Sequence, residues 1–251
     1  MVYITGDCHG QYNRFSTKSF PDQKEMTRDD IVIVCGDFGI WNGGPDEEYW
    51  LKWLSRKNFT IVFVDGNHEN FNRLYGDEFK IVDFHGGKAH KIKKNVYHLM
   101  RGYIFDFDGK KFWAFGGASS HDIRDGILDP DSFSNEEDYK AALRVWRLTK
   151  VFWRVKNVSW WEQELPSNEE MEFGRNVLEE AGWEVDHVIT HCCPQEIAST
   201  MGYFGADRET MYFDEIALKL HFKGWHFGHY HENRDVYGKF HCRYEKIERL
   251  I

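Results

Sequence analysis

The sequence predicts an α/β fold, and the regular alternation of strand-like and helix-like segments in its first third carries that prediction. Short β-branched runs occur at Val2–Thr5, Ile31–Cys35 and Thr60–Val64, and each is followed at once by a Gly-Asp or Asp-Gly-Asn turn. Asp46–Arg56 lies between the last two runs and has Pro45 and three acidic residues at its start, which is typical of a helix. Strands recurring roughly every 30 residues with helices between them are the βαβ pattern.

The strands are continuous apolar runs, which favours a sheet covered on both faces. Val151–Val158 is β-branched and aromatic, and its pattern leaves helix and strand open. The other expected elements are a hairpin over 103–115 closed by Asp108-Gly109, helices over Glu136–Thr149 and Asn168–Ala181, and strands over Val185–Thr190, Gly224–Phe227 and Val236–His241. We expect one domain over residues 1–251, on which residues 121–167 form a lid or an insertion.

Composition excludes several classes of protein. The chain has 251 residues and a formal net charge of −9, whereas non-specific nucleic-acid binding needs a basic surface. Phosphate chemistry stays open, since bound metal cations can supply positive charge. No apolar run approaches the ~18–20 residues of a membrane span, and the first residues lack an export signal. Five cysteines without a CxxC spacing favour a reducing compartment. We therefore expect a cytoplasmic protein without membrane contact, and its oligomeric state stays open.

Five short clusters place metal-binding side chains directly after expected strands. In an open α/β sheet, the loops at the carboxyl ends of the strands converge on one crevice, so residues distant in sequence meet there. A lone Asp-x-His after a glycine is usually only a turn, but five such clusters in one chain argue against coincidence. They are Gly6-Asp7-Cys8-His9-Gly10, Gly36-Asp37-Phe38-Gly39, Gly66-Asn67-His68-Glu69, Thr190-His191-Cys192-Cys193-Pro194 and Gly228-His229-Tyr230-His231.

The donors in these clusters are too many for one octahedral ion, but they suit two ions that share a bridging carboxylate. Nitrogen and oxygen ligands without thiolate favour manganese, iron, nickel or zinc over magnesium or calcium. Two metals about 3.5–4 Å apart are a known device for in-line displacement at phosphorus. The donors are two Asp carboxylates, one Asn carbonyl and four His imidazoles: Asp7, Asp37, Asn67, His9, His191, His229 and His231.

The order Asp-x-His, Gly-Asp, Gly-Asn-His-Glu, His, Gly-His-x-His resembles that of the calcineurin-like metallophosphoesterases, over nearly the whole chain from Asp7 to His231. Gly116–Ser120 and residues 159–167 are similar to a largely uncharacterised subgroup common in bacterial and phage genomes. The resemblance implies a four-layer α/β/β/α sandwich with a dinuclear metal site at the carboxyl-terminal ends of the strands.

The same resemblance implies a role for each site residue. His68 would be a histidine that binds no metal, meets the phosphate and protonates the leaving oxygen. The cofactor would be two divalent ions, with manganese ahead of iron, nickel or zinc. Asp7, His9 and His231 would hold the first metal, Asp37 would bridge both metals, and Asn67, His191 and His229 would hold the second.

One departure from the Ser/Thr protein phosphatase branch is informative. There the second motif continues into Asp-Arg-Gly, which supplies a carboxylate that orients the catalytic histidine and an arginine that clamps phosphate. Here the motif continues after Asp37 as Phe-Gly-Ile-Trp, so both are missing. Asp46 and Asp122 are candidates for the carboxylate. Arg124 is a candidate for the clamp, or a residue that only caps or salt-bridges a loop.

Residues 140–156 are basic in an otherwise acidic chain. As a helix, this stretch would place Lys140, Arg144, Arg147 and Arg154 on one face, with Trp146, Trp153 and Trp160 on the other. One interpretation is an amphipathic lid whose Trp face packs on the body. The other is a lid facing the substrate, so that Arg124 and Arg154 bind an anionic or nucleobase-bearing group.

These patterns predict a metal-dependent phosphoesterase that hydrolyses phosphate mono- or diesters by in-line attack of a metal-bridging hydroxide. Its partner would be a small phosphorylated substrate or a nucleotide. Hydrolysis of nucleotide or dinucleotide polyphosphates and Ser/Thr-type protein phosphatase activity stay open as alternatives. A non-catalytic, metal-dependent binding scaffold is a further alternative, which the complete ligand set and the intact His68 disfavour.

Overall fold

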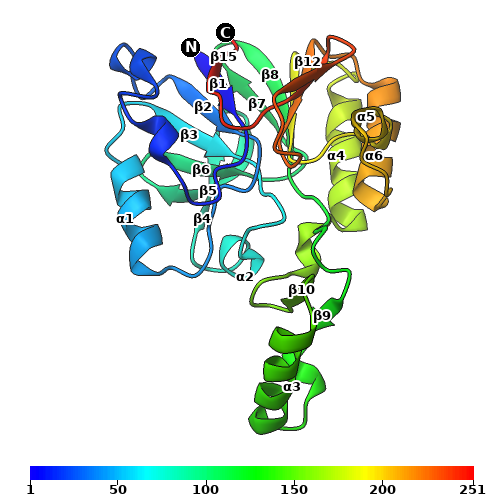
Figure 1. The fold of residues 1–251 in the computed structure, drawn as a ribbon. Helices are drawn as coiled ribbons and strands as arrows, with labels where there is room; N and C mark the ends of the chain where they lie inside the picture. Colours follow the sequence, from blue (N-terminus) through cyan, green and yellow to red (C-terminus); the bar gives the residue numbers. More distant parts are fainter.

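The structure, a computed structural model, describes residues 1–251. Two β-sheets pack face to face, with α1 outside one sheet and α4 and α6 outside the other (Figure 1). This arrangement confirms the α/β class and the four layers that the sequence predicts. None of the helices combines the length and the hydropathy that crossing a bilayer requires.

The first sheet contains the predicted βαβ units. Its inner strands β1, β2, β3 and β6 run parallel, while β15, β5 and β4 are antiparallel to their neighbours. The helix expected from Asp46 begins at Pro45 and ends at Leu54. The strand order is β15 (Glu248–Arg249), β1 (Val2–Thr5), β2 (Ile31–Val34), β3 (Thr60–Phe63), β6 (Val96–Leu99), β5 (Gly87–Lys93) and β4 (Lys80–Phe84), with helices α1 (Pro45–Leu54) and α2 (Phe71–Leu74) and 3-10 turns over Asn13–Phe15 and Pro21–Lys24.

The second sheet contains the predicted hairpin, whose turn residues Asp108 and Gly109 both have positive φ. The single strand expected over Val236–His241 is wrong, because Tyr237 and Gly238 adopt φ of 50° and 67° and turn the chain into a hairpin. The strand order is β13 (Arg234–Val236), β14 (Phe240–Cys242), β12 (Gly224–Phe227), β11 (His187–Thr190), β8 (Lys110–Phe115) and β7 (Ile104–Phe107), with helices α4 (Asn168–Glu180), α5 (Gln195–Met201) and α6 (Arg208–Lys219).

The core explains why the strands are apolar on both faces. One cluster of buried side chains lies between the sheets and joins Ile4 and Val62 of the first sheet to Phe112 and Ile189 of the second. Separate clusters lie beneath α1 and beneath α4 to α6. The central strands are therefore covered on each side, and their carboxyl ends are held at a common edge.

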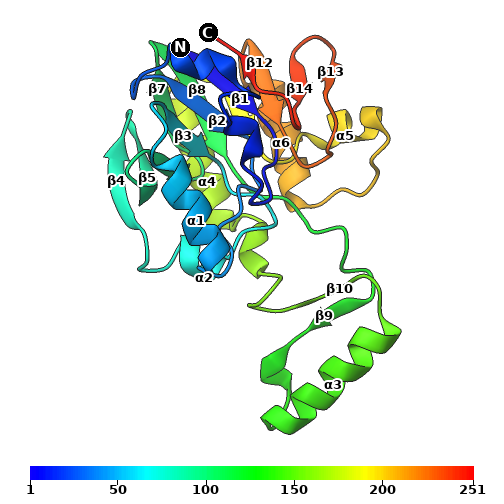
Figure 2. The same ribbon diagram turned by 60° about the vertical axis from the view of Figure 1, so that its left-hand side comes forward.

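Residues 121–167, which we call the arm, start and end at the body of the protein, and their middle part with β9, β10 and α3 projects away from the two sheets (Figures 1 and 2). The short parallel strands β9 (Gly126–Leu128) and β10 (Trp153–Val155) carry α3 (Glu136–Thr149), and 3-10 turns cover Pro130–Ser132 and Glu162–Glu164. The helix ends before Trp153, so residues 140–156 are not one helix. Trp146 packs on the Trp153 ring at 5.6 Å and lies beside Gly126. The interpretation in which the Trp face of the arm packs on the body is therefore wrong for α3.

Candidate metal centre

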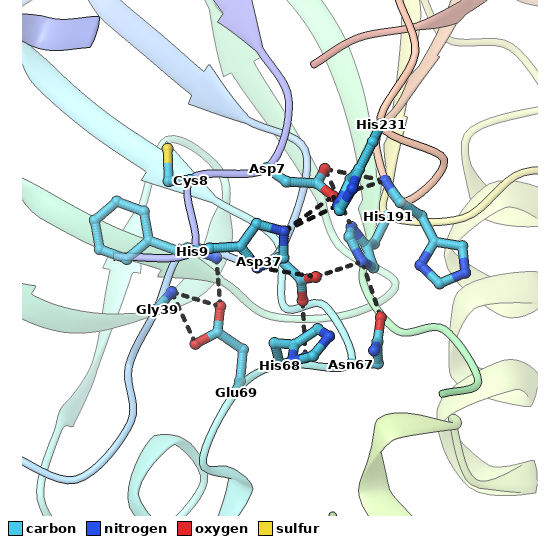
Figure 3. A network of polar contacts seen from close by, with 12 residues as sticks. Asp7, Cys8, His9, Asp37, Gly39, Asn67, His68, Glu69, His191 and His231 are labelled. Atoms are coloured by element: carbon cyan, nitrogen blue, oxygen red, sulfur yellow. Dashed lines mark hydrogen bonds and ion pairs between the residues drawn. The ribbon is translucent and has the colours of Figure 1, made fainter. Parts of the chain in front are cut away.

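The loops that follow β1, β2, β3, β11 and β12 meet at one edge of the sheets (Figure 3). Each loop starts where a buried parallel strand ends, so the side chains reach one place although they are far apart in sequence. The structure brings together Asp7 and His9 after β1, Asp37 after β2, Asn67 and His68 after β3, His191 after β11, and His229 and His231 after β12.

Asp7, His9 and His231 form the first group of candidate ligands, and their ligand atoms all lie within 4.8 Å of one another. The Asp7 Oδ2 atom is 3.1 Å from His231 Nε2 and 3.8 Å from His9 Nε2. The two Nε2 atoms are 3.0 Å apart. Three donors that converge in this way fit a single cation.

Asp37 lies between a candidate ligand of each metal. Its Oδ2 atom is 3.7 Å from His9 Nδ1 and 3.5 Å from His191 Nε2. The Asn67 Oδ1 atom is 3.3 Å from the same His191 nitrogen. Asp7, Asp37 and His191 also form a second group within 4.8 Å. Asp7 therefore belongs to both groups, and both carboxylates lie between the two candidate sites.

The backbone of this site is strained in a way that aims side chains inward. His9, Asp37, His229 and His231 have φ of 47°, 45°, 65° and 52°, a left-handed conformation that is uncommon outside glycine. Such strain persists only where the surrounding structure enforces it, and it clusters at functional sites. A Cβ atom at Gly66 would overlap the Asp37 carboxylate, so the chain needs glycine there.

The charges of the site fit divalent cations. Asp7 and Asp37 are buried, and their only ion-pair partners are histidines. Burial alone would lower the pKa of His191, but Asp37 and Asp7 raise it to about 10. In the metal-free protein, a protonated His191 thus offsets part of the negative charge of the two carboxylates. The Cys35 carbonyl accepts from His191 Nδ1 at 2.7 Å, which leaves Nε2 facing Asp37 and Asn67.

His68 lies beside the candidate ligands and contacts the root of the arm. Its backbone N–H donates to Asp37 Oδ1 at 2.8 Å. Arg154 Nη2 is 3.3 Å from His68 Nδ1 and 3.2 Å from Nε2, so the guanidinium lies against the ring. Arg154 also binds both carboxylate oxygens of Asp122, at 2.6 and 2.7 Å. Burial lowers the pKa of His68, and Arg154 adds to this effect while Asp37 opposes it.

The other candidates for supporting residues lie elsewhere. Asp122 reaches His68 only through Arg154, and Asp46 is exposed in the first turn of α1. Arg124 is exposed on the arm, with its guanidinium carbon 4.1 Å from the centre of the Phe152 ring. It forms no hydrogen bond or ion pair with a candidate ligand, so its role toward phosphate stays a prediction.

Sequence reasoning missed His121 and the role of Glu69. His121 Nε2 is 2.7 Å from His229 Nε2. It follows β8 just as the predicted clusters follow their strands, which is a signal that could have identified it. The buried Glu69 carboxyl accepts the backbone N–H groups of residues 38–40, the loop directly after Asp37 (Figure 3). Glu69 therefore fixes the loop that carries a central carboxylate.

Three cavities surround the centre. The largest, of about 530 Å³, adjoins His121 and His229 and includes Tyr203 and Phe204. A second, of about 440 Å³, extends from His9. The smallest, of about 260 Å³, lies between His68 and the arm and is lined by Trp41, Asn42, Asn70, Arg154, Val158, Ser159 and Trp161. Space for a bound molecule therefore adjoins the centre on several sides.

Comparison with known families defines the class of protein: the chain belongs to the calcineurin-like phosphoesterase family, whose model matches residues 1–233. Among curated proteins it is similar to lariat debranching enzyme A of Xenopus laevis, with 24% identity over 168 residues. That match covers 60% of this chain and only 29% of the relative. Among solved structures it is similar to a phosphopantetheinyl hydrolase from Mycobacterium tuberculosis, with a TM-score of 0.45, 13% identity, and coverage of 96% of this chain and 87% of that chain.

We predict that Glu69→Ala lowers the free energy of unfolding by at least about 3 kcal/mol, because an unpaired buried N–H costs about 1–3 kcal/mol and three would be left. Urea denaturation followed by circular dichroism measures the change. Glu180→Ala, at an exposed position of α4, is the control and should stay within about 0.5 kcal/mol of wild type. A loss below about 1 kcal/mol for Glu69→Ala would show that residues 38–40 do not depend on it.

Proposed function

We propose that this protein hydrolyses phosphate mono- or diesters with two divalent cations, with manganese ahead of iron, nickel or zinc. The observation that carries the proposal is the burial of Asp7 and Asp37 among His9, His191 and His231, without a Lys or Arg ion pair to either carboxylate. Family membership supports metal-dependent phosphoester hydrolysis in general.

The ligands divide between two sites that share the Asp37 carboxylate. When bound, the two cations would supply an activated water and neutralise charge on the phosphate. The bridging role of Asp37 is supported by its position between His9 and His191. In this proposal Asp7, His9 and His231 hold one cation, Asn67, His191 and His229 hold the other, and Asp37 contacts both.

His68 would donate a proton to the leaving oxygen. Its main chain is fixed on both sides, since its N–H donates to Asp37 and its carbonyl accepts the Trp41 indole N–H at 2.8 Å. The cavity of about 260 Å³ that His68 and Arg154 line is open to a leaving group. Arg154 would take over the contact with phosphate that the second motif lacks, while Asp122 holds the guanidinium in place.

The cavities bear on the choice of substrate. Aromatic side chains occur in each of them, including Trp50, Trp161 and Phe204, and flat apolar rings suit a nucleobase. A nucleotide or a dinucleotide polyphosphate is therefore the favoured form of the small phosphorylated substrate. A panel of nucleotides assayed beside p-nitrophenyl and bis-p-nitrophenyl phosphate, with and without Mn²⁺, tests the proposed activity.

Asp37→Ala should reduce the rate at least ~10³-fold, equivalent to about 4 kcal/mol of barrier, because it removes the carboxylate that both cations share. Steady-state hydrolysis of bis-p-nitrophenyl phosphate in excess Mn²⁺ measures the loss. Asp77→Ala, an exposed position, is the matched control and should match wild type. Full activity of a folded Asp37→Ala variant would contradict the bridging role.

His68→Ala should retain about two cations per chain but lose roughly 10²–10⁴ in rate, the usual scale for general acid catalysis. The loss should be greater for alkyl phosphates than for p-nitrophenyl phosphate, whose leaving group hardly needs a proton. Kinetics on both esters, combined with metal analysis, measure the two effects. Equal losses on both esters together with lost metal would make His68 a ligand.

Arg154→Ala should lower activity on every substrate, since its guanidinium lies against His68. Arg124→Ala should raise KM several-fold only for substrates large enough to extend along the arm, because Arg124 is remote from the ligands. Parallel kinetics on a nucleotide and a small aryl ester distinguish the two, with Arg147→Ala on the exposed side of α3 as control. If both variants keep wild-type kinetics and salt dependence on both substrates, the arm does not select substrate.

A further inference from the structure

The loop from Ala118 to His121 follows β8 and contributes no residue to the proposed ligand set. Two neighbouring side chains of this loop nevertheless contact candidate ligands of the same cation. Ser120 contacts Asn67, and His121 contacts His229. We propose that residues 118–121, anchored by Glu164, are the structure that orients the ligands of the second cation. This inference rests on the proposed function.

The Asn67 contact has a defined direction. The Asn67 Nδ2 atom donates to Ser120 Oγ at 3.4 Å, and Ser120 Oγ donates to Glu164 Oε2 at 2.7 Å. An amide has its donors and its acceptor at opposite ends, so this chain turns the carbonyl oxygen away from Ser120. That oxygen lies 3.3 Å from His191 Nε2. Ser120 thereby holds the Asn67 oxygen in the orientation that a cation requires.

Glu164 holds the loop through more than one contact. Its Oε1 atom accepts the Ser120 backbone N–H at 2.8 Å, and its carbonyl accepts the Ala118 N–H at 3.1 Å. Both Ser120 and Glu164 are at least 95% buried, so water does not readily replace these bonds. The carbonyl of the preceding Gln163 accepts from Arg101 at 2.8 Å, which ties the same turn to the body of the protein.

The His229 contact works through the opposite nitrogen of a ligand. A histidine that binds a metal through one ring nitrogen usually gives the other to a hydrogen-bond partner. His229 Nε2 is 2.7 Å from His121 Nε2, so Nδ1 is the nitrogen that would bind the cation. Neither histidine belongs to a group of three converging His, Cys, Asp or Glu ligand atoms, and His121 is not among the proposed ligands. His121 is therefore a positioning residue.

The support is specific to one cation. Ser120, His121 and Glu164 form no polar contact with His9 or His231 of the first group. The Ser120–Glu164 contact also joins the two sequence motifs that are similar to the uncharacterised subgroup, Gly116–Ser120 and residues 159–167. Holding the loop is therefore a role that the two motifs would share. Disrupting this contact should weaken one cation site and spare the other.

Calorimetric titration of the metal-free protein with Mn²⁺ tests the inference without relying on activity. Wild type should show two binding events. Ser120→Ala and His121→Ala should each weaken one event about 10–100-fold, the usual effect of removing a group that orients a ligand, and leave the other unchanged. Ser132→Ala is the matched control, because Ser132 is exposed and its Oγ donates to the Asp129 carbonyl at 2.7 Å, outside the proposed loop and away from every candidate ligand.

The outcomes separate this inference from the proposed function. Absence of Mn²⁺ binding by wild type would overturn the proposed function itself. Two unchanged events in both folded variants, or equal weakening of both events, would overturn only the role of the loop. Complete loss of one event in His121→Ala would overturn its positioning role and make it a ligand. His121 is exposed, so His121→Ala should fold even if Ser120→Ala does not, and it then tests the inference by itself.

Discussion

The central physical constraint on this protein is the burial of two carboxylates side by side at the edge of two sheets. An ionised carboxylate away from water is costly unless it is paired, and histidines are the only side chains paired with Asp7 and Asp37. Strained backbone at His9 and Asp37 and the absence of a side chain at Gly66 keep the donors converging. In the proposed function, cations bound to the folded chain would offset the cost of assembling such a site.

The arm connects this centre to a remote part of the chain. Its helix α3 lies far from the ligands, but its root supplies Arg154, held by Asp122, directly against His68. The returning end of the arm supplies Glu164, which holds the loop beside Asn67. The arm therefore supplies no candidate ligand, but it contacts His68, the proposed acid, and the loop that would support one cation site.

The sequence predicts the features that depend on local pattern. The strands β1, β2 and β3, which lead to candidate ligands, are β-branched runs closed by a glycine turn, and the rules of α/β sheets then place the loops together. The contact of Arg154 with His68 joins residues 86 positions apart, and it exists only because the chain folds back through β10. His121 follows β8 but lies outside the five short clusters, and the turn at Tyr237 required a non-glycine residue at positive φ, which sequence patterns rarely predict.

The most direct test of the central claim is a crystal structure of the protein grown with Mn²⁺ and measured at a wavelength where manganese scatters anomalously. Two anomalous peaks about 3.5–4 Å apart are predicted, one between Asp7, His9 and His231 and one between Asn67, His191 and His229, with Asp37 contacting both. A single peak, or peaks away from these residues, would contradict the dinuclear centre.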